Sequence, residues 1–131
     1  MNEPRQKLMA ILGEEGCYFD CLVHLGEGQV HERIDSIPVF LDALEKNYIK
    51  MNCLVLDAAA IMESITGVKW IKRNERPDYE PKPGELEILR FERKSGAGTV
   101  VHFVTKDYDP YGDSRTVREG ALVSKRIFSR A

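Results

Sequence analysis

Cys17 stands directly after Gly16 and opens a dense apolar segment that predicts a buried helix. The unpaired N–H groups and the dipole at the first turn of a helix favour a thiolate over a thiol. A thiolate there is a nucleophile, and the backbone N–H groups beside it can stabilise an oxyanion. Gly16 has no side chain, so a substrate backbone can approach the sulfur closely. The alternative interpretation is a buried core cysteine, because free cysteine is among the most buried residue types.

His102 lies in residues 99–105, where the alternating pattern places it on the same strand face as Val100 and Val104. A histidine on this face is directed at apolar packing, which we expect to be the helical layer. Such a histidine is more often a hydrogen-bonded core residue than a catalytic one. A role as general base therefore requires a partner that orients the ring.

Asp109 is the predicted partner of His102. If residues 105–106 form a two-residue turn, residue 102 pairs with residue 109, and the carboxylate faces the imidazole. A carboxylate there fixes the tautomer of the ring and completes a nucleophile, base and orienter triad. Sliding the turn by one residue brings Tyr111 opposite His102 in place of Asp109. Ordinary turn roles for Asp107 and Asp109 remain the alternative.

A different site can be drawn from Cys17, Cys21 and His24, which share one helical face and are suitable zinc ligands, with His31 or Cys53 as the fourth. Three ligands on one straight helix reach too far along its axis to converge on one ion. A disulfide between Cys17 and Cys21 is also disfavoured by geometry on consecutive helical turns. We therefore expect packing roles for the other cysteines, and no metal and no cofactor.

The elements that must position these residues are helical in the first half of the chain. Pro4 suits a first helical turn, and Gly13 is a plausible stop. The central helix runs from Cys17 to Leu25 and ends at the following glycines. Of the other two predicted helices, the third has Ser36 as its cap and Pro38 in its first turn, and the fourth, after the cap Asp57, covers residues 58–66.

The second half of the chain is predicted to be β-structure. Branched and aromatic residues are concentrated in four segments, separated by glycine and proline, at residues 68–73, 85–93, 99–105 and 122–128. Residues 95–98 have the composition of a hairpin connection. Helices followed by sequential hairpins predict an α+β fold, with N-terminal helices packed on a C-terminal antiparallel sheet.

The composition is that of an ordinary globular domain. The chain has 131 residues, of which 43% are hydrophobic and 31% charged, and we expect one domain over residues 1–131. The net charge of −2 provides no basic field for nucleic acid. No apolar run is long enough to span a membrane and no signal peptide is apparent, so we expect a cytoplasmic protein with three reduced cysteines.

Gly16-Cys17 at the start of the central helix, His102 on a strand, and Asp109-Pro110 soon after it resemble the order found in papain-like cysteine peptidases of the bacteriocin-processing, double-glycine type. Residues 16–19 and 108–117 more closely resemble a small family of bacterial and phage proteins. The resemblance implies a minimal papain-like fold. It also implies a Cys17 nucleophile, a His102 base and an orienting Asp109 that act on an amide or related acyl bond of a peptide or protein substrate, in a hydrolase or acyltransferase.

Two features separate this sequence from that pattern. The spacing from histidine to aspartate in those peptidases is usually longer than the seven residues between His102 and Asp109, and one residue before the cysteine differs. The double-glycine peptidases carry a glutamine about six residues before the cysteine, and its side chain completes the oxyanion hole. Ile11 occupies that position here, and Glu15 cannot donate a hydrogen bond while it is ionised. The alternative function is therefore a catalytically inactive papain-like domain that binds a protein or a ligand.

Overall fold

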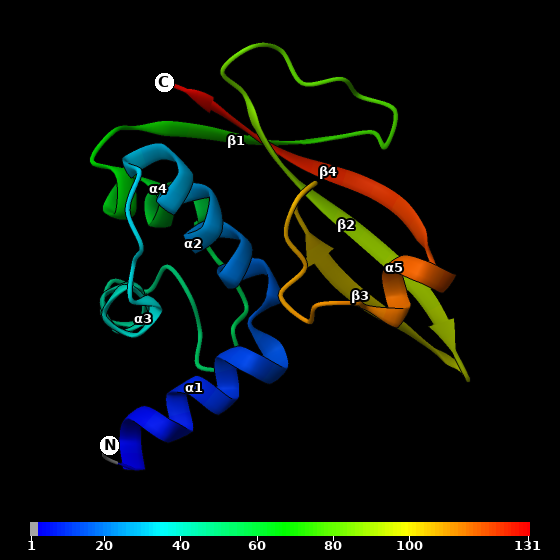
Figure 1. Cartoon of the computed structure of the whole chain (residues 1–131), viewed down its shortest axis with the longest axis horizontal. Helices are drawn as coiled ribbons and strands as arrows, with labels where there is room; N and C mark the ends of the chain where they lie inside the picture. The colour runs from blue at the N-terminus through cyan, green and yellow to red at the C-terminus, as the bar shows by residue number, and fades with distance from the viewer. Residues whose placement is uncertain (1–2) are drawn as a thin grey trace.

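The computed structural model describes residues 3–131 and has helices in the first half of the chain and strands in the second (Figure 1). Helices α1 to α4 gather on one side of the antiparallel sheet, so the predicted α+β class is confirmed. The elements of this described part are α1 (Glu3–Glu15), α2 (Cys17–Val30), α3 (Ser36–Glu45), α4 (Ala58–Thr66), β1 (Trp70–Glu75), β2 (Leu86–Ser95), β3 (Gly98–Val104), α5 (Arg115–Glu119) and β4 (Ala121–Arg130).

Helix α4 has the ends that its caps predict. The Asp57 side chain accepts a hydrogen bond from the Ala60 N–H at 3.0 Å. Gly67 ends the helix in the left-handed region with φ 77°.

Helix α2 is longer than predicted, because it continues through Gly26 and Gly28 to Val30. A Cβ on Gly26 would lie 2.2 Å from Cγ2 of Ile65, so this glycine permits the close packing of α2 against α4. The prediction that the glycines end the helix is wrong. The left-handed residue that ends it is His31.

The sheet has the strand order β1-β4-β2-β3, and every pair is antiparallel. The predicted hairpin joins β2 to β3. The prediction of sequential hairpins is wrong for the other strands, because β4 lies between β1 and β2 and pairs with both. The predicted pairing of residues 107–109 with β3 is also wrong, because this segment is a loop that leads into the short helix α5.

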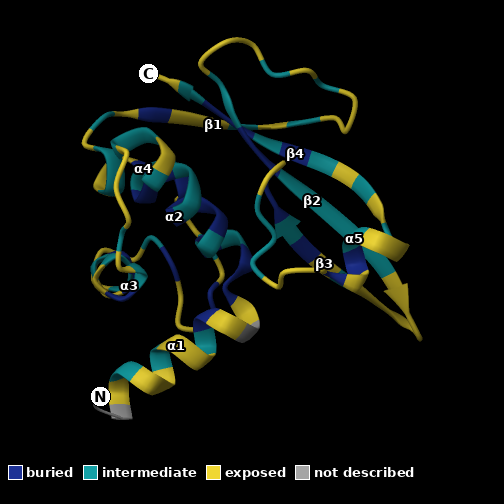
Figure 2. Cartoon of the chain, in the orientation of Figure 1, coloured by how far each residue is buried: buried dark blue, intermediate teal, exposed yellow. Residues whose placement is uncertain are grey.

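The core lies between α2 and the sheet. Buried positions are concentrated along α2 and on the parts of β2, β3 and β4 that lie nearest to it (Figure 2). Its largest fully buried side chains include Phe19 and Leu22 of α2, Phe40 of α3, Ile61 of α4 and Phe128 of β4. Removing such side chains from water is the main favourable contribution to folding, and this packing fixes α2 against the strands.

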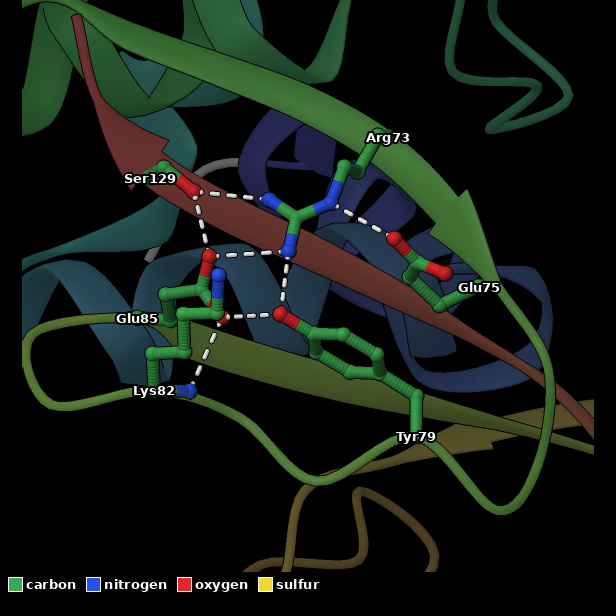
Figure 3. A network of polar contacts seen from close by, with 6 residues as sticks. All are labelled: Arg73, Glu75, Tyr79, Lys82, Glu85 and Ser129. Carbon is green, nitrogen blue, oxygen red and sulfur yellow. Dashed lines mark hydrogen bonds and ion pairs between the residues drawn. The ribbon is translucent and has the colours of Figure 1, made fainter.

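The long loop between β1 and β2 is held against the sheet by a polar network (Figure 3). Arg73 donates to Glu85 and to the Ser129 hydroxyl, each at 2.8 Å, and also to the Tyr79 hydroxyl. Tyr79 in turn donates to Glu85 at 2.6 Å, and the Lys82 N–H donates to the same carboxylate oxygen at 2.9 Å. These hydrogen bonds lower the pKa of Glu85 to about 2. The loop is therefore a fixed connection.

Candidate active site

Cys17 is the first residue of α2, and its side chain is buried. Gly16 precedes it as the N-cap residue and provides no side-chain hydrogen bond to the first turn. A Cβ on Gly16 would lie 2.6 Å from the Leu12 carbonyl oxygen of α1. The glycine is thus required by the close approach of α1. The space that we expected a substrate backbone to use is occupied by the protein itself.

Helix α2 lies along the edge strand β3. The Phe103 N–H donates a hydrogen bond to the Cys17 sulfur, and the Cys21 thiol donates to the Phe103 carbonyl oxygen at 3.5 Å. The ring of Tyr18 stacks on the ring of Phe103 with the centroids 4.5 Å apart. Because Phe103 directly follows His102, these contacts place the sulfur beside the peptide group that carries the histidine.

His102 and Asp109 are in direct contact. Nε2 of His102 lies 2.7 Å from Oδ1 of Asp109, and the histidine side chain is only 1% exposed. The Asp109 carboxylate also accepts the N–H groups of Tyr111 at 2.9 Å and Ser114 at 3.0 Å. The structure therefore joins the predicted base and orienter, although through a loop and not through the strand pairing that we expected.

The protonation of this pair follows from its hydrogen bonds. Burial acts to raise the pKa of Asp109, but the hydrogen bonds from His102, Tyr111 and Ser114 outweigh it, so the pKa lies below its ordinary value. An ionised carboxylate only accepts, so Nε2 of His102 must carry the hydrogen. In the neutral imidazole Nδ1 is then an acceptor, and it is buried without a hydrogen-bond partner among residues 3–131.

Tyr111 is a site residue that the preferred strand register missed. Its ring stacks on the imidazole of His102 with the centroids 4.4 Å apart. Burial, together with the electrostatic effect of Cys17 and Asp20 in their ionised forms, raises the pKa of Tyr111 to about 12. The alternative register did place Tyr111 opposite His102. Asp109 and Tyr111 both contact the ring because the segment forms a compact loop.

The electrostatics of Cys17 differ from the expectation based on the helix dipole. Burial raises the pKa of the thiol, and the backbone N–H groups of Phe103 and Tyr18 only partly oppose this effect. The charge of Asp20 adds to the increase. Burial also raises the pKa of Asp20 itself to about 7. The resting cysteine is therefore a protonated thiol at neutral pH, and the predicted resting thiolate is wrong.

His24 and Cys21 lie apart from any shared metal position. His24 contacts Asp107 at 3.2 Å and stacks on Tyr108 with the centroids 4.4 Å apart. Within residues 3–131, no cluster of three or more histidine, cysteine or acidic side chains is arranged to hold a metal ion. All three cysteines are free thiols. The zinc alternative is thus unsupported, and His24 instead anchors the loop that carries Asp109 to α2.

Comparison with known proteins gives one match. The model of a family described as "Protein of unknown function, DUF261" matches residues 1–130. No curated protein and no solved structure matches the chain. None of the helices in the described part of the chain combines the length and the hydrophobicity that a transmembrane span requires.

Proposed function

This chain belongs to the DUF261 family, and we propose that it is a cysteine-dependent hydrolase or acyltransferase acting on an amide or related acyl bond of a peptide or protein. One observation carries the proposal. The imidazole of His102 is oriented by Asp109 through Nε2, while Nδ1 is buried without a hydrogen-bond partner in the described part of the chain, and the next residue, Phe103, donates its N–H to the Cys17 sulfur. A histidine that served only to pack the core would gain nothing from a buried Nδ1 without a hydrogen-bond partner.

In the first half of the reaction, the Cys17 thiol transfers its proton to Nδ1 of His102 as the sulfur attacks the carbonyl carbon. The ionised Asp109 stabilises the imidazolium that forms. The C–N bond then breaks, the imidazolium protonates the leaving amine through Nδ1, and the acyl group remains on the sulfur as a thioester.

In the second half, a water molecule attacks the thioester and gives its proton to Nδ1 of His102. The C–S bond breaks, and the sulfur takes the proton back as the carboxylic acid leaves. An amine or alcohol in place of water makes the same step an acyl transfer. Because the resting thiol is protonated, the attack requires that His102 accept its proton, whereas an enzyme that stores a thiolate needs no such transfer.

The oxyanion is stabilised by the backbone in this proposal. The N–H groups of Cys17 and Tyr18 lie at the first turn of α2, where no side chain caps them, and both are directed at the sulfur. Donors at a helix start suit a developing negative charge. They take the role of the glutamine side-chain amide of the double-glycine peptidases, because Ile11 occupies the position of that glutamine here.

The test uses 4-nitrophenyl acetate, an activated ester that reports acylation by the release of nitrophenolate. We expect a burst close to one equivalent per chain and an acetyl group that peptide mass spectrometry locates on Cys17. Cys17→Ser abolishes the burst, and His102→Ala slows it by about 100-fold or more. Cys53→Ala is the matched control and keeps the burst. Equal, slow acetylation of all three cysteines would contradict the proposal.

The raised pKa of Cys17 favours a second candidate function, a papain-like domain that binds a protein or ligand without catalysis. This candidate predicts no burst with any activated ester, although the protein is folded. It also predicts that Cys17→Ala retains the biological activity in a cell assay. Loss of that activity in a folded Cys17→Ala protein argues against it.

A further inference from the structure

A cavity of about 520 Å³ opens beside Cys17, and His102 is not among its described lining residues. One wall is formed by Cys17 and Tyr18 at the start of α2, and another by residues 53–56. The floor is the helix-facing side of the sheet, to which all four strands contribute. The floor residues are Lys72, Asn74, Arg90, Val101, Phe103 and Arg126.

The charge on this floor is positive. Arg90, Arg126 and Lys72 line the cavity, whereas Glu15 is the one acidic residue among its described lining residues. Arg126 pairs with Ile88 across β4 and β2, so Arg90 lies diagonally opposite it on the same face. Burial, reinforced by the like charge of Arg90, lowers the pKa of Arg126. The fold therefore holds two guanidinium groups close together in a half-buried position, which is unfavourable without an anion.

Arg126 differs from Arg73 and Arg90 in its partners. Arg73 contacts two carboxylates, and Arg90 contacts Glu92 at 3.3 Å. For Arg126, no carboxylate lies within ion-pair distance among residues 3–131. Its contacts are the Ser124 hydroxyl at 2.8 Å and the face of the Phe103 ring at 5.6 Å. The Phe103 ring face and the Ser124 hydroxyl use only part of the Arg126 guanidinium, so its other N–H groups remain available to a carboxylate of a ligand.

Two stacked rings link the cavity wall that holds Cys17 to the cavity floor that holds Arg126. Tyr18 directly follows Cys17 and stacks on Phe103, and Phe103 also lies under Arg126. The Tyr18 hydroxyl is buried without a hydrogen-bond partner in the described part of the chain. The stacked rings therefore connect the reacting thiol to the guanidinium along the cavity.

We propose that this cavity is a specificity subsite in which Arg126, with Arg90, binds a carboxylate of the substrate while its acyl group reaches Cys17. The inference rests on the proposed function and adds the substrate class, an acidic peptide or acidic amide. The carboxylate belongs either to the acyl part or to the leaving group, and both sources share the same recognition by a guanidinium.

The experiment compares three activated esters on the full chain. The first, 4-nitrophenyl pentanoate, is neutral. The second, the mono-4-nitrophenyl ester of glutaric acid, has its carboxylate in the acyl part, and the third, 4-pentanoyloxy-3-nitrobenzoate, has its carboxylate in the leaving group. Each acylation rate is divided by the rate with N-acetylcysteine in solution. We expect one acidic ester to exceed the neutral ester by about tenfold or more, and this preference to decrease as salt is added.

The variants assign the preference to the guanidinium. Arg126→Met removes the preference for the acidic ester, whereas Arg126→Lys keeps part of it. Lys94→Met, at an exposed position of β2 outside the cavity, is the matched control and keeps all of it. Acylation of Cys17 without any acidic preference, or a preference that survives Arg126→Met, overturns the subsite and leaves the proposed function in place. Failure of all three esters to acylate Cys17 overturns the proposed function and the subsite together.

Discussion

Nε2 of His102 lies 2.7 Å from the Asp109 carboxylate, although none of the strands within residues 3–131 pairs with the outer edge of β3 to bring the two residues together. β3 ends at Val104, and the Thr105 N–H donates to the Tyr108 carbonyl oxygen at 2.9 Å, which turns the chain back. The orientation of the His102 ring therefore depends on the internal hydrogen bonds of a short loop.

Asp109→Ala should destabilise the protein by about 1–3 kcal/mol, because it leaves the buried Nε2 of His102 without an acceptor. It should also slow acylation of Cys17 about as strongly as His102→Ala does. Urea denaturation and the nitrophenyl acetate burst measure the two effects. Asp113→Ala is the matched control on the same loop, because Asp113 is exposed and makes a surface ion pair with Arg118 at 3.0 Å. Equal stability of the two variants would show that the buried contact is not energetically important.

Asp20→Asn should raise the stability of the protein at pH 8 but not near pH 4. The pKa of Asp20 is raised by burial to about 7 from 3.8, so the folded state holds the proton more tightly than the unfolded state. The stability contributed by this group is present below pH 4 and is lost as the pH rises through 7. The expected gain at pH 8 is on the order of 1 kcal/mol, roughly 3–5 °C in Tm for a chain of this length. Thermal denaturation at the two pH values checks the sign.

The same substitution should make Cys17 react faster with iodoacetamide at neutral pH. The negative charge of Asp20 raises the pKa of the Cys17 thiol, and the amide removes this charge. Pulse labelling followed by peptide mass spectrometry measures the rate at each cysteine. An unchanged rate at Cys17 would mean that burial alone keeps the thiol protonated.

Gly26→Ala and Gly28→Ala should have opposite effects on stability, although the two glycines lie in the same helix. A Cβ at position 26 meets Cγ2 of Ile65 at 2.2 Å, whereas nothing lies within 4 Å of a Cβ at position 28. Gly26→Ala should cost about 1–3 kcal/mol through overpacking, and Gly28→Ala should gain about 0.5–1 kcal/mol through helix propensity. Urea denaturation of both variants decides the comparison. Adding Ile65→Ala to Gly26→Ala should relieve part of the overpacking.

Glu85→Gln should increase the hydrogen exchange of the loop between β1 and β2 while leaving the centre of β2 protected. The Glu85 carboxylate accepts from Arg73, Tyr79 and the Lys82 N–H, and a neutral amide satisfies these donors less well. Glu80→Gln, an exposed position of the same loop, serves as the control. Unchanged exchange in Glu85→Gln would show that the proline residues alone hold the loop.

Local signals in the sequence predicted the elements that depend on neighbouring residues. The caps Asp57 and Gly67 set the ends of α4, and residues 95–98 form the hairpin between β2 and β3. Cys17 was correctly placed at the start of a helix because Gly16 and the apolar segment after it are adjacent in the chain. Each of these features follows from a few consecutive residues.

The remaining features depend on contacts between distant segments, which a single sequence does not reveal. The pairing of β1 with β4 joins Trp70 to Arg130, and no local signal distinguishes it from pairing with β2. The proximity of Arg90 and Arg126 likewise follows from the β2–β4 register. The protonated state of Cys17 depends on burial by packing, which outweighed the local effect of the helix dipole.

The position of α2 along β3 also affects the solubility of the protein. An open strand edge offers unpaired N–H and C=O groups to the strands of other molecules, and such pairing is a route to aggregation. At Phe103 both groups are occupied by the sulfurs of Cys17 and Cys21. The helix that carries Cys17 thus also protects this part of the sheet edge from intermolecular strand addition. Substitutions that loosen the start of α2 are therefore expected to promote self-association as well as to reduce reactivity.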